Sequence, residues 1–429
     1  MENNRSLTLL LSANIVSGFA TGISMLAIPW YFTTIADKAS VFAAIYAATT
    51  LASVFWNLYA GTLIDRYPRK SIFIYVSMVC GSILLGVSGY GYMKGEVPIE
   101  LVALVFITTM FNYNIHFGAL YAFGQELSSP SQYGKISSYL EIQNQATSVF
   151  SGAFAALLLT GVQEGQTINI AGFVFSMPFE FPKWELSDIF LMDGITYVIS
   201  ILLISSIRYQ PSNIRPTDTS GIFQRIKTGL RFLKAHPKLF LFGNYSYSIF
   251  VVLMVEVFML LPLYVDTHLG AGSDVYASAE VFYSLGAMLA GIFIRRIFRN
   301  RNTVFSIIVM MLITTLIFYA VAFSKSVGIF YAFSFLIGVT NAGTRVLRTT
   351  YLFSHISNDI IGRTNSVFSV INILLRSVFL LIFSLAWFSS GSNVIWAYFI
   401  CGTFVLVSAI PLMISYKSLL TTKSTASGK

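Results

Sequence analysis

Ionisable side chains inside long apolar runs are the residues in this sequence most able to do chemistry. Four of them could bind and release a proton, and these are Glu256, Glu141, Glu280 and His116. A charge inside a hydrocarbon layer is costly unless it is paired or wet, so such residues mark functional sites by default. Histidine also changes its charge near neutral pH. We predict that these four are proton-coupling candidates, with Glu256 first.

A second set of polar residues in the same runs could line a cavity for a small molecule. The candidates are four amides and three guanidinium groups: Asn14, Asn112, Asn114, Asn144, Arg345, Arg348 and Arg376. A guanidinium group suits a carboxylate or another planar anion. The alternatives are purely structural roles. Glu256 could form a static pair with Arg345 or Arg348, and His116 could be a satisfied packing residue.

Membrane-spanning helices must position these residues. Of the 429 residues, 55% are hydrophobic and 10% are charged, whereas a soluble chain is about 25% charged. A helix needs about 20 mainly apolar residues to cross a bilayer. Twelve runs meet this requirement, at 8–34, 40–63, 71–93, 99–127, 135–161, 186–208, 238–265, 275–297, 303–324, 327–355, 363–390 and 393–416. The first is read as a retained span, because no small-residue cleavage site follows it.

The basic residues indicate how these spans are oriented. Most lysines and arginines fall in one set of loops and span ends, and the opposite loops hold only Lys38, Lys94, Lys183 and Lys325. Because basic loops stay in the cytosol, we expect both termini to be cytosolic. The net charge of +9 then reflects topology, and no nucleic-acid partner is predicted.

Motifs of enzymes and metal sites are absent from the sequence. Cys80 and Cys401 both fall in apolar runs, so no disulfide or metal cluster is predicted. Neither a Gly-x-x-x-x-Gly-Lys-Ser/Thr phosphate loop nor a His-Glu-x-x-His pattern occurs. We therefore expect no enzyme activity and no cofactor.

The chain also reads as two similar halves. Gly134 to Ser138 matches Gly362 to Ser366 at an offset of 228, and Ile28-Pro29 matches Leu261-Pro262 at an offset of 233. Such repeats are typical of secondary transporters, whose substrate site lies between the halves. The predicted domains are bundles at 1–208 and 238–416, a cytosolic linker at 209–237 with an amphipathic segment from Ile222 to Leu233, and a tail at 417–429. The outer loop 162–185 contains a strand-like stretch, Ile168 to Phe175.

One charged turn carries a resemblance to a known family. The run Gly61-Thr-Leu-Ile-Asp65-Arg66-Tyr-Pro-Arg69-Lys70 resembles the loop 2–3 signature of the major facilitator superfamily, with Pro68 and Lys70 as mild departures. Three further features resemble the branch of macrolide-efflux (Mef-type) and enterobactin-exporter-like proteins. They are the run from Ile361 to Phe368, the run from Phe190 to Asp193 and the run from Ile28 to Asp37.

This resemblance implies an all-α membrane protein with twelve transmembrane helices in two pseudo-symmetric six-helix bundles. It implies alternating access in a bacterial inner (cytoplasmic) membrane, with helices 1, 4, 7 and 10 around a central cavity. We expect a monomeric carrier that exports a small amphipathic compound, such as a drug, a macrolide or a siderophore, in exchange for protons. Asp65 could form a conformational clasp with Arg69 or a neighbouring helix end, and Asp193 is expected to be structural.

Two alternatives stay open. One is a nutrient importer or facilitator on the same fold, because a scaffold that opens alternately to each side of the membrane can carry a substrate in either direction. The other is a non-transporting membrane receptor.

Overall fold

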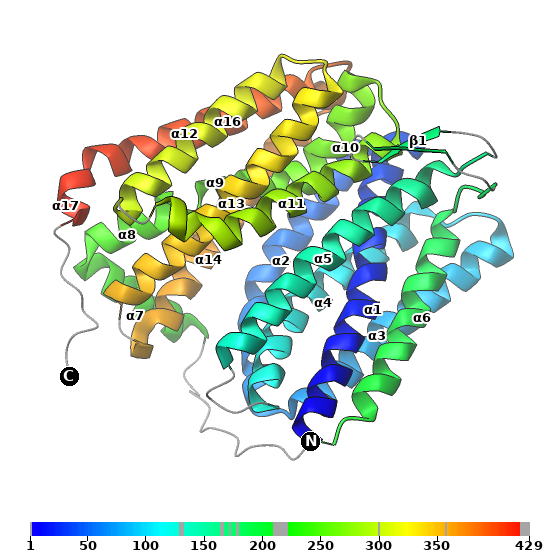
Figure 1. Cartoon of the computed structure of the whole chain (residues 1–429), viewed down its shortest axis with the longest axis horizontal. Helices are drawn as coiled ribbons and strands as arrows, with labels where there is room; N and C mark the ends of the chain where they lie inside the picture. Colours follow the sequence, from blue (N-terminus) through cyan, green and yellow to red (C-terminus); the bar gives the residue numbers. More distant parts are fainter. Residues whose placement is uncertain are drawn as a thin grey trace. The chain divides into compact units, whose positions relative to one another are not determined.

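The computed structural model describes residues 2–127, 133–163, 167–170, 173–176, 180–208, 222–298, 301–356 and 358–420. Helices make up nearly all of the described chain (Figure 1). Among these residues, eleven stretches are long and apolar enough to cross a membrane. The remaining predicted span, 135–161, corresponds to the 28-residue helix α5 (Tyr133–Thr160). The predicted fold class, an all-α multi-pass membrane protein, is confirmed.

The first half contains long helices at the predicted spans. They are α1 (Glu2–Trp30), α2 (Ala39–Arg66), α3 (Arg69–Lys94), α4 (Ile99–Glu126), α5 and α6 (Leu186–Ser205). Local chemistry explains several of their ends. Gly95, with φ +86°, ends α3 because glycine adopts the left-handed conformation without a steric penalty. At the start of α6, Glu185 and Asp188 form a reciprocal capping box.

The second half opens with a separate helix, α7 (Ile222–Ala235), and a segmented seventh span. That span runs through α8 (Pro237–Tyr245), α9 (Ser248–Val255), the π-helix η3 (Glu256–Leu260), α10 (Leu261–Leu263) and the π-helix η4 (Tyr264–Leu269). The later helices are α11 (Ser273–Ile297), α12 (Thr303–Ala322), α13 (Val327–His355), α14 (Asn358–Phe383), α15 (Ala386–Ser389), α16 (Val394–Ile414) and α17 (Tyr416–Leu420).

The internal repeat extends to the irregular backbone at the ends of spans 1 and 7. Pro29 in α1 is followed by a π-helix, η1 (Tyr31–Ile35), and Pro262 is followed by η4. A proline has no N–H and so leaves the carbonyl four residues earlier without its helical donor. The Thr33 hydroxyl of η1 donates to a different carbonyl, that of Pro29 itself (2.9 Å). The repeat thus places a register change of the backbone at the same position in each half.

A small hairpin interrupts the helical pattern. Strands β1 (Thr167–Ile170) and β2 (Phe173–Ser176) pair antiparallel, with Ile168 opposite Phe175. The strand-like stretch predicted in the outer loop is confirmed. Next to it, Val162 and Phe181 form an isolated antiparallel bridge.

The described residues group into two compact units. Unit 1 comprises 1–38, 55–218 and 271–281, and unit 2 comprises 39–54, 219–270 and 282–429. Each unit includes a half-helix from the other half of the sequence, namely the start of α11 in unit 1 and the start of α2 in unit 2. The domain boundaries proposed from the sequence remain a prediction.

Within unit 1, α1 contacts both α5 and α6, and the ribbons lie side by side (Figure 1). Close contact with α5 depends on small residues, since an added Cβ at Gly22 would lie 2.6 Å from the Ser151 hydroxyl oxygen. Small residues let helices approach closely in a membrane, where no hydrophobic force drives them together. Helix α1 is therefore the central element that positions the polar groups of this unit.

Helix α7 packs on protein within unit 2. Leu233 is fully buried, and an added Cβ on Gly229 would clash with the Arg363 carbonyl of α14. Its basic side chains Lys227, Arg231 and Lys234 are exposed. Residues 209–221 of the predicted linker lie outside the described residues. The apolar face of the amphipathic segment is thus covered by the start of α14.

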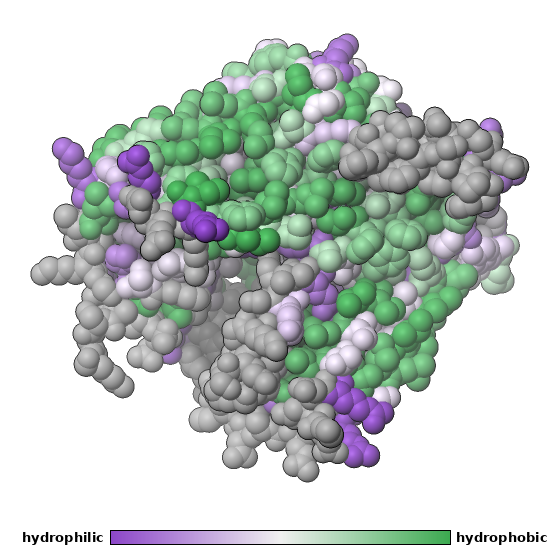
Figure 2. Space-filling view, viewed as in Figure 1, coloured by the Kyte–Doolittle hydropathy of each residue, from purple (hydrophilic) through white to green (hydrophobic). Residues whose placement is uncertain are grey.

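Apolar side chains dominate the visible helix surfaces. Figure 2 shows broad hydrophobic areas along α12 and α16. Leu316, Val407 and Ile410 are among the exposed residues on these two helices. Such a surface is stable in contact with lipid, in agreement with the composition.

Candidate functional site

In unit 1, a polar cluster joins α1, α4 and α5. The Asn14 side-chain oxygen lies 2.7 Å from His116 Nε2, and the Asn14 amide nitrogen donates to the Asn144 oxygen at 3.5 Å. Because an amide oxygen can only accept, Nε2 of His116 is the donor in this contact. Phe73 packs edge-on against the imidazole ring, with 5.2 Å between centroids. Three of the predicted candidates are therefore brought together here.

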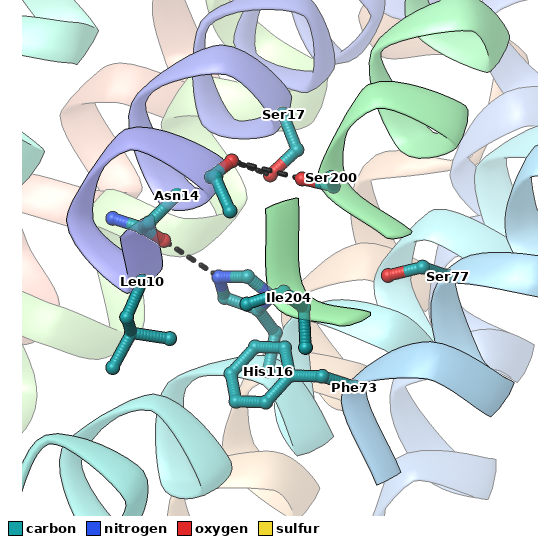
Figure 3. Close-up of a pocket in the computed structure, with 9 residues that line it drawn as sticks. Leu10, Asn14, Ser17, Phe73, Ser77, His116, Ser200 and Ile204 are labelled. Atoms are coloured by element: carbon teal, nitrogen blue, oxygen red, sulfur yellow. Dashed lines mark hydrogen bonds between the residues drawn. The ribbon is translucent and has the colours of Figure 1, made fainter. Parts of the chain in front are cut away.

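A small cavity adjoins this cluster (Figure 3). Its volume is about 10 Å³, close to the smallest space that holds one water molecule. The polar groups of its lining are Asn14, Ser17, Ser77, His116 and Ser200. The cavity is thus polar enough for a single water and far too small for a substrate.

A second buried cluster in unit 1 surrounds Asp193 of α6. Its carboxylate oxygens accept hydrogen bonds from Thr21 (3.0 Å) and Ser24 (2.7 Å) of α1. Tyr197, one turn further along α6, accepts a hydrogen bond from Asn112 of α4 at 2.7 Å. Asn112, predicted as a cavity residue, is therefore bonded inside the bundle.

The remaining candidates of unit 1 are dispersed. Glu280, at the start of α11, accepts a hydrogen bond from Ser148 of α5 (2.8 Å). Asn114 is half-buried on α4. The side chain of Glu141 lies outside the described residues.

The charged turn between α2 and α3 ties helix ends of unit 1 together. Arg69 forms an ion pair with Glu126 at the end of α4 (3.5 Å). Lys70 donates to the carbonyls of Ser205 (2.7 Å) and Ile207 (2.8 Å) at the end of α6. A cation there satisfies carbonyls that have no helical donor.

The proposed clasp remains a prediction. The side chains of Asp65 and Arg66, and the surroundings of Gly61, lie outside the described residues. The contacts described for this turn, those of Arg69 and Lys70, all join residues of unit 1.

In unit 2, Glu256 is almost completely buried, with 2% of its surface exposed. It is the first residue of the π-helix η3, and its Oε1 accepts a hydrogen bond from the Tyr398 hydroxyl of α16 at 3.1 Å. Nearby, the Tyr46 hydroxyl of α2 donates to the Met254 carbonyl at 2.9 Å. The acid therefore lies on an irregular helix that is held by two tyrosines.

Arg348 makes its contacts at the junction between α8 and α9. Its guanidinium donates to the Ser246 carbonyl (3.0 Å) and lies 3.5 Å from the centroid of the Tyr247 ring. Among the described residues Arg348 makes these contacts and no ion pair with Glu256, and a static pairing of Glu256 with Arg345 stays a prediction. This cation–π arrangement fixes the junction between α8 and α9.

Arg345 and Arg376 differ in how fully their side chains are partnered. Arg345 has an interaction partner. Arg376 on α14 has a buried Nε atom that lacks a hydrogen-bond partner among the described residues. One turn earlier on the same helix, the Asn372 side-chain oxygen is also buried and unpartnered. Most buried polar atoms are satisfied, whereas this face of α14 carries two of the unpartnered polar atoms in the described part of unit 2.

Sequence reasoning missed the hydroxyl partners of the two buried acids. Tyr398 and Ser24 were not singled out, because a tyrosine or serine in an apolar run is unremarkable without its neighbours. The repeat gives a weak indication, since the offset of 233 places Glu256 level with Ile23, next to Ser24.

The chain is similar to known transport proteins. It is 26% identical over 178 residues to the putative bacilysin exporter BacE of Bacillus subtilis (strain 168), which covers 42% of this chain and 38% of that protein. It is 23% identical over 282 residues to macrolide efflux protein A of Streptococcus pyogenes, covering 65% and 63%. The chain thus aligns with well under half of the first relative and under two thirds of the second.

Solved structures share the fold. The POT family transporter PepTSo superposes with a TM-score of 0.74 at 12% identity, covering 98% of this chain and 99% of that one. A bacterial homolog of the human lysosomal transporter Spinster gives 0.72 at 11% identity, covering 99% of each.

The family model of the Major Facilitator Superfamily matches residues 10–379. This match, the helical membrane fold and the exporter relatives confirm the resemblance seen in the sequence, including the efflux branch. They indicate a transporter rather than an enzyme. The chain belongs to the major facilitator superfamily.

Proposed function

We propose that this protein exports a small amphipathic compound in exchange for protons, by alternating access. The two relatives are an exporter and an efflux protein by name, and this favours export over import. Because these relatives are only 26% and 23% identical over part of their length, the substrate class is part of this proposal.

The observation that carries the proposal is Glu256. It combines near-complete burial, a neutral hydroxyl partner in Tyr398 and a position at the start of a π-helix. A hydroxyl can donate to a carboxylate or accept from a carboxylic acid, so the acid can gain and lose a proton with its partner in place. π-Helical turns in α-helices are frequent at functional sites. We assign proton coupling to this residue.

The substrate would bind at the face of α14 that carries Asn372 and Arg376. Their unpartnered atoms supply one acceptor and one cationic donor, spaced one helical turn apart. This pair suits a compound with a hydrogen-bond donor next to an anionic or carbonyl group. The aromatic neighbours Tyr247 and Phe368, 6.1 Å apart, would contact its apolar part.

The test is transport in liposomes that contain the purified full chain. A pH gradient of either sign is imposed, and macrolides, bacilysin, catecholate siderophores and amphipathic dyes are screened for flux. We expect a compound to accumulate on the acidic side of the membrane, from which the protons flow. This accumulation should be lost when a protonophore is added. Uphill flux that is unaffected by the protonophore would contradict proton coupling. Accumulation in the direction of proton flow would favour an importer.

A further inference from the structure

Asp193 is a buried acid in unit 1 that the cycle proposed above does not use. None of its surface is exposed, and its two oxygens accept from the hydroxyls of Thr21 and Ser24. Asp193 forms no ion pair among the described residues, and the ion pair of Arg69 with Glu126 lies elsewhere. The titratable groups that face Asp193 are Cys80 of α3 and Tyr197 of α6. Its partners in the described residues are therefore neutral.

Hydroxyl partners suit both protonation states of a carboxyl group. Ser24 and Thr21 donate to the ionised form in the present geometry. Each hydroxyl oxygen can also accept a hydrogen bond from a protonated carboxyl group. A lysine or arginine in their place could only donate and would favour the ionised form alone. The site can thus take up one proton, which forms an O–H bond to Asp193, without moving a helix.

The hydrogen bonds of Thr21 provide a route by which this change could be sensed. Its hydroxyl lies 3.0 Å from the Asp193 carboxylate and 3.4 Å from the Tyr197 hydroxyl. When Asp193 carries a proton, the Thr21 hydrogen is free to turn toward Tyr197. Tyr197 is held by Asn112, which lies one turn before His116 on α4. Protonation would therefore alter hydrogen bonds that join α1, α6 and α4.

The repeat supplies an independent observation. In unit 2 a buried acid also lies where the first and last spans of the half meet, since Glu256 of span 7 accepts from Tyr398 of span 12. In unit 1 the acid is on span 6 and the hydroxyls are on span 1. Acid and hydroxyl have exchanged helices, while the buried acid–hydroxyl contact is present in both halves.

We propose that Asp193 is a proton-binding site of the first bundle, and that Thr21 and Tyr197 are positioning residues that transmit its protonation to α1 and α4. This inference rests on the proposed proton-coupled function and adds a second site to Glu256. It differs from the structural role expected from the sequence.

The test is infrared spectroscopy of the purified full chain in lipid during a pH titration, in which a protonated carboxyl group gives its own C=O band. The measurement uses Glu256→Gln as the parent, so that Asp193 is observed without the other acid. We expect a titrating band that disappears when Asp193→Asn is added. The matched control, Glu100→Gln at the exposed start of α4, should leave the band in place. An identical titration with and without Asp193→Asn would overturn the proposal.

Two further variants test transmission and guard against misfolding. Ser24→Ala keeps the acid and removes one donor, so the midpoint of the titrating band should move. Tyr197→Phe should keep the band and change the pH profile of transport, whereas a purely structural tyrosine would lower stability and leave that profile unchanged. An unmoved midpoint in Ser24→Ala would contradict the assignment even if Asp193→Asn fails to fold.

The result is separable from the function proposed above. If wild-type flux ignores the pH gradient while the Asp193 band titrates, the site stands and proton-coupled export fails. If flux follows the gradient and Asp193→Asn leaves the spectrum unchanged, export stands and the site fails.

Discussion

Single polar side chains in this protein differ in whether their hydrogen-bonding capacity is filled. Asn14, Asn112 and Arg348 are bonded within their own unit, and so they hold helices together. Arg376 and Asn372 retain buried atoms without partners in the described chain. A residue whose hydrogen bonds are all made inside the protein contributes to stability, whereas one with an unpartnered atom is available to a ligand. Substitutions in the first group should therefore lower stability, and substitutions in the second should weaken binding.

Glu256→Gln should abolish uphill transport while leaving exchange of substrate down its gradient. Glutamine keeps the size of the side chain and a hydrogen-bond acceptor for Tyr398, but it cannot carry a proton at neutral pH. Counterflow and gradient-driven uptake in the same liposomes measure the two activities. Glu100→Gln, an exposed acid of the same type, serves as the control. Full accumulation by Glu256→Gln would exclude this residue as the coupling site.

Arg376→Met should mainly weaken substrate binding, whereas Arg348→Met should mainly lower stability. Loss of the open Arg376 should weaken substrate binding about tenfold or more, because a hydrogen bond to a charged group contributes about 1.5–3 kcal/mol. Loss of Arg348 should instead lower the free energy of unfolding by about 1–3 kcal/mol, because the Ser246 carbonyl is left buried without a donor. Substrate titrations and thermal unfolding of both variants check this. Equal losses of stability in the two variants would contradict the distinction.

Helix pairs are held by close backbone contacts at a few glycines. In unit 2, an added Cβ on Gly286 of α11 would clash with the Phe335 carbonyl, and one on Gly338 of α13 with the Tyr283 carbonyl. The contact is reciprocal, and the Asn341 amide donates to the Tyr283 hydroxyl beside it (2.9 Å). Small residues at such crossings are typical of membrane helix pairs.

Gly338→Ala should therefore destabilise the protein by about 1–3 kcal/mol, the usual cost of overpacking. The opposing atom is backbone and cannot rotate away. Gly291→Ala on α11 is the matched control, since an added Cβ there meets nothing within 4 Å. Thermal unfolding in detergent measures the difference between the variants. A melting temperature of Gly338→Ala equal to that of the control would show that the crossing is looser than described.

The elements themselves were largely predictable from the sequence. The predicted spans 99–127 and 303–324 correspond to α4, Ile99–Glu126, and α12, Thr303–Ala322, because length and apolarity decide which segments cross lipid. The π-helices at Glu256–Leu260 and Tyr264–Leu269 were not predicted. Pro262 was the one indication of them. A change in the hydrogen-bond register of a helix does not alter the amino-acid composition, so composition cannot predict it.

For the whole molecule, the distribution of basic residues predicts two cytosolic termini. A cysteine at position 417 should be labelled by an impermeant maleimide only in inside-out membranes, and one at position 94 only in intact cells. Both lysines are exposed, so Lys417→Cys and Lys94→Cys are accessible to the reagent. The native Cys80 and Cys401 are buried and should give little background. Labelling of both positions from the same side would contradict the orientation.

The sequence by itself determined the membrane class, the helix positions, the repeat and the family. These depend on hydropathy, on charge placement and on a short motif, which are local properties of the chain. It also identified Glu256, His116 and Arg376 as unusual, because a charged or titratable group within an apolar run is visible without coordinates.

Only the tertiary structure decided which polar residues are partners. It placed Asn14 against His116 and Arg348 against Tyr247, and it paired Glu256 with Tyr398, which lies 142 residues away. A hydrogen bond depends on atoms within about 3 Å of each other, and the sequence separation of two residues on different helices does not specify that distance. The hydrogen-bond partners of Asp193 and Arg348 were not predicted for this reason, since they too come from other helices.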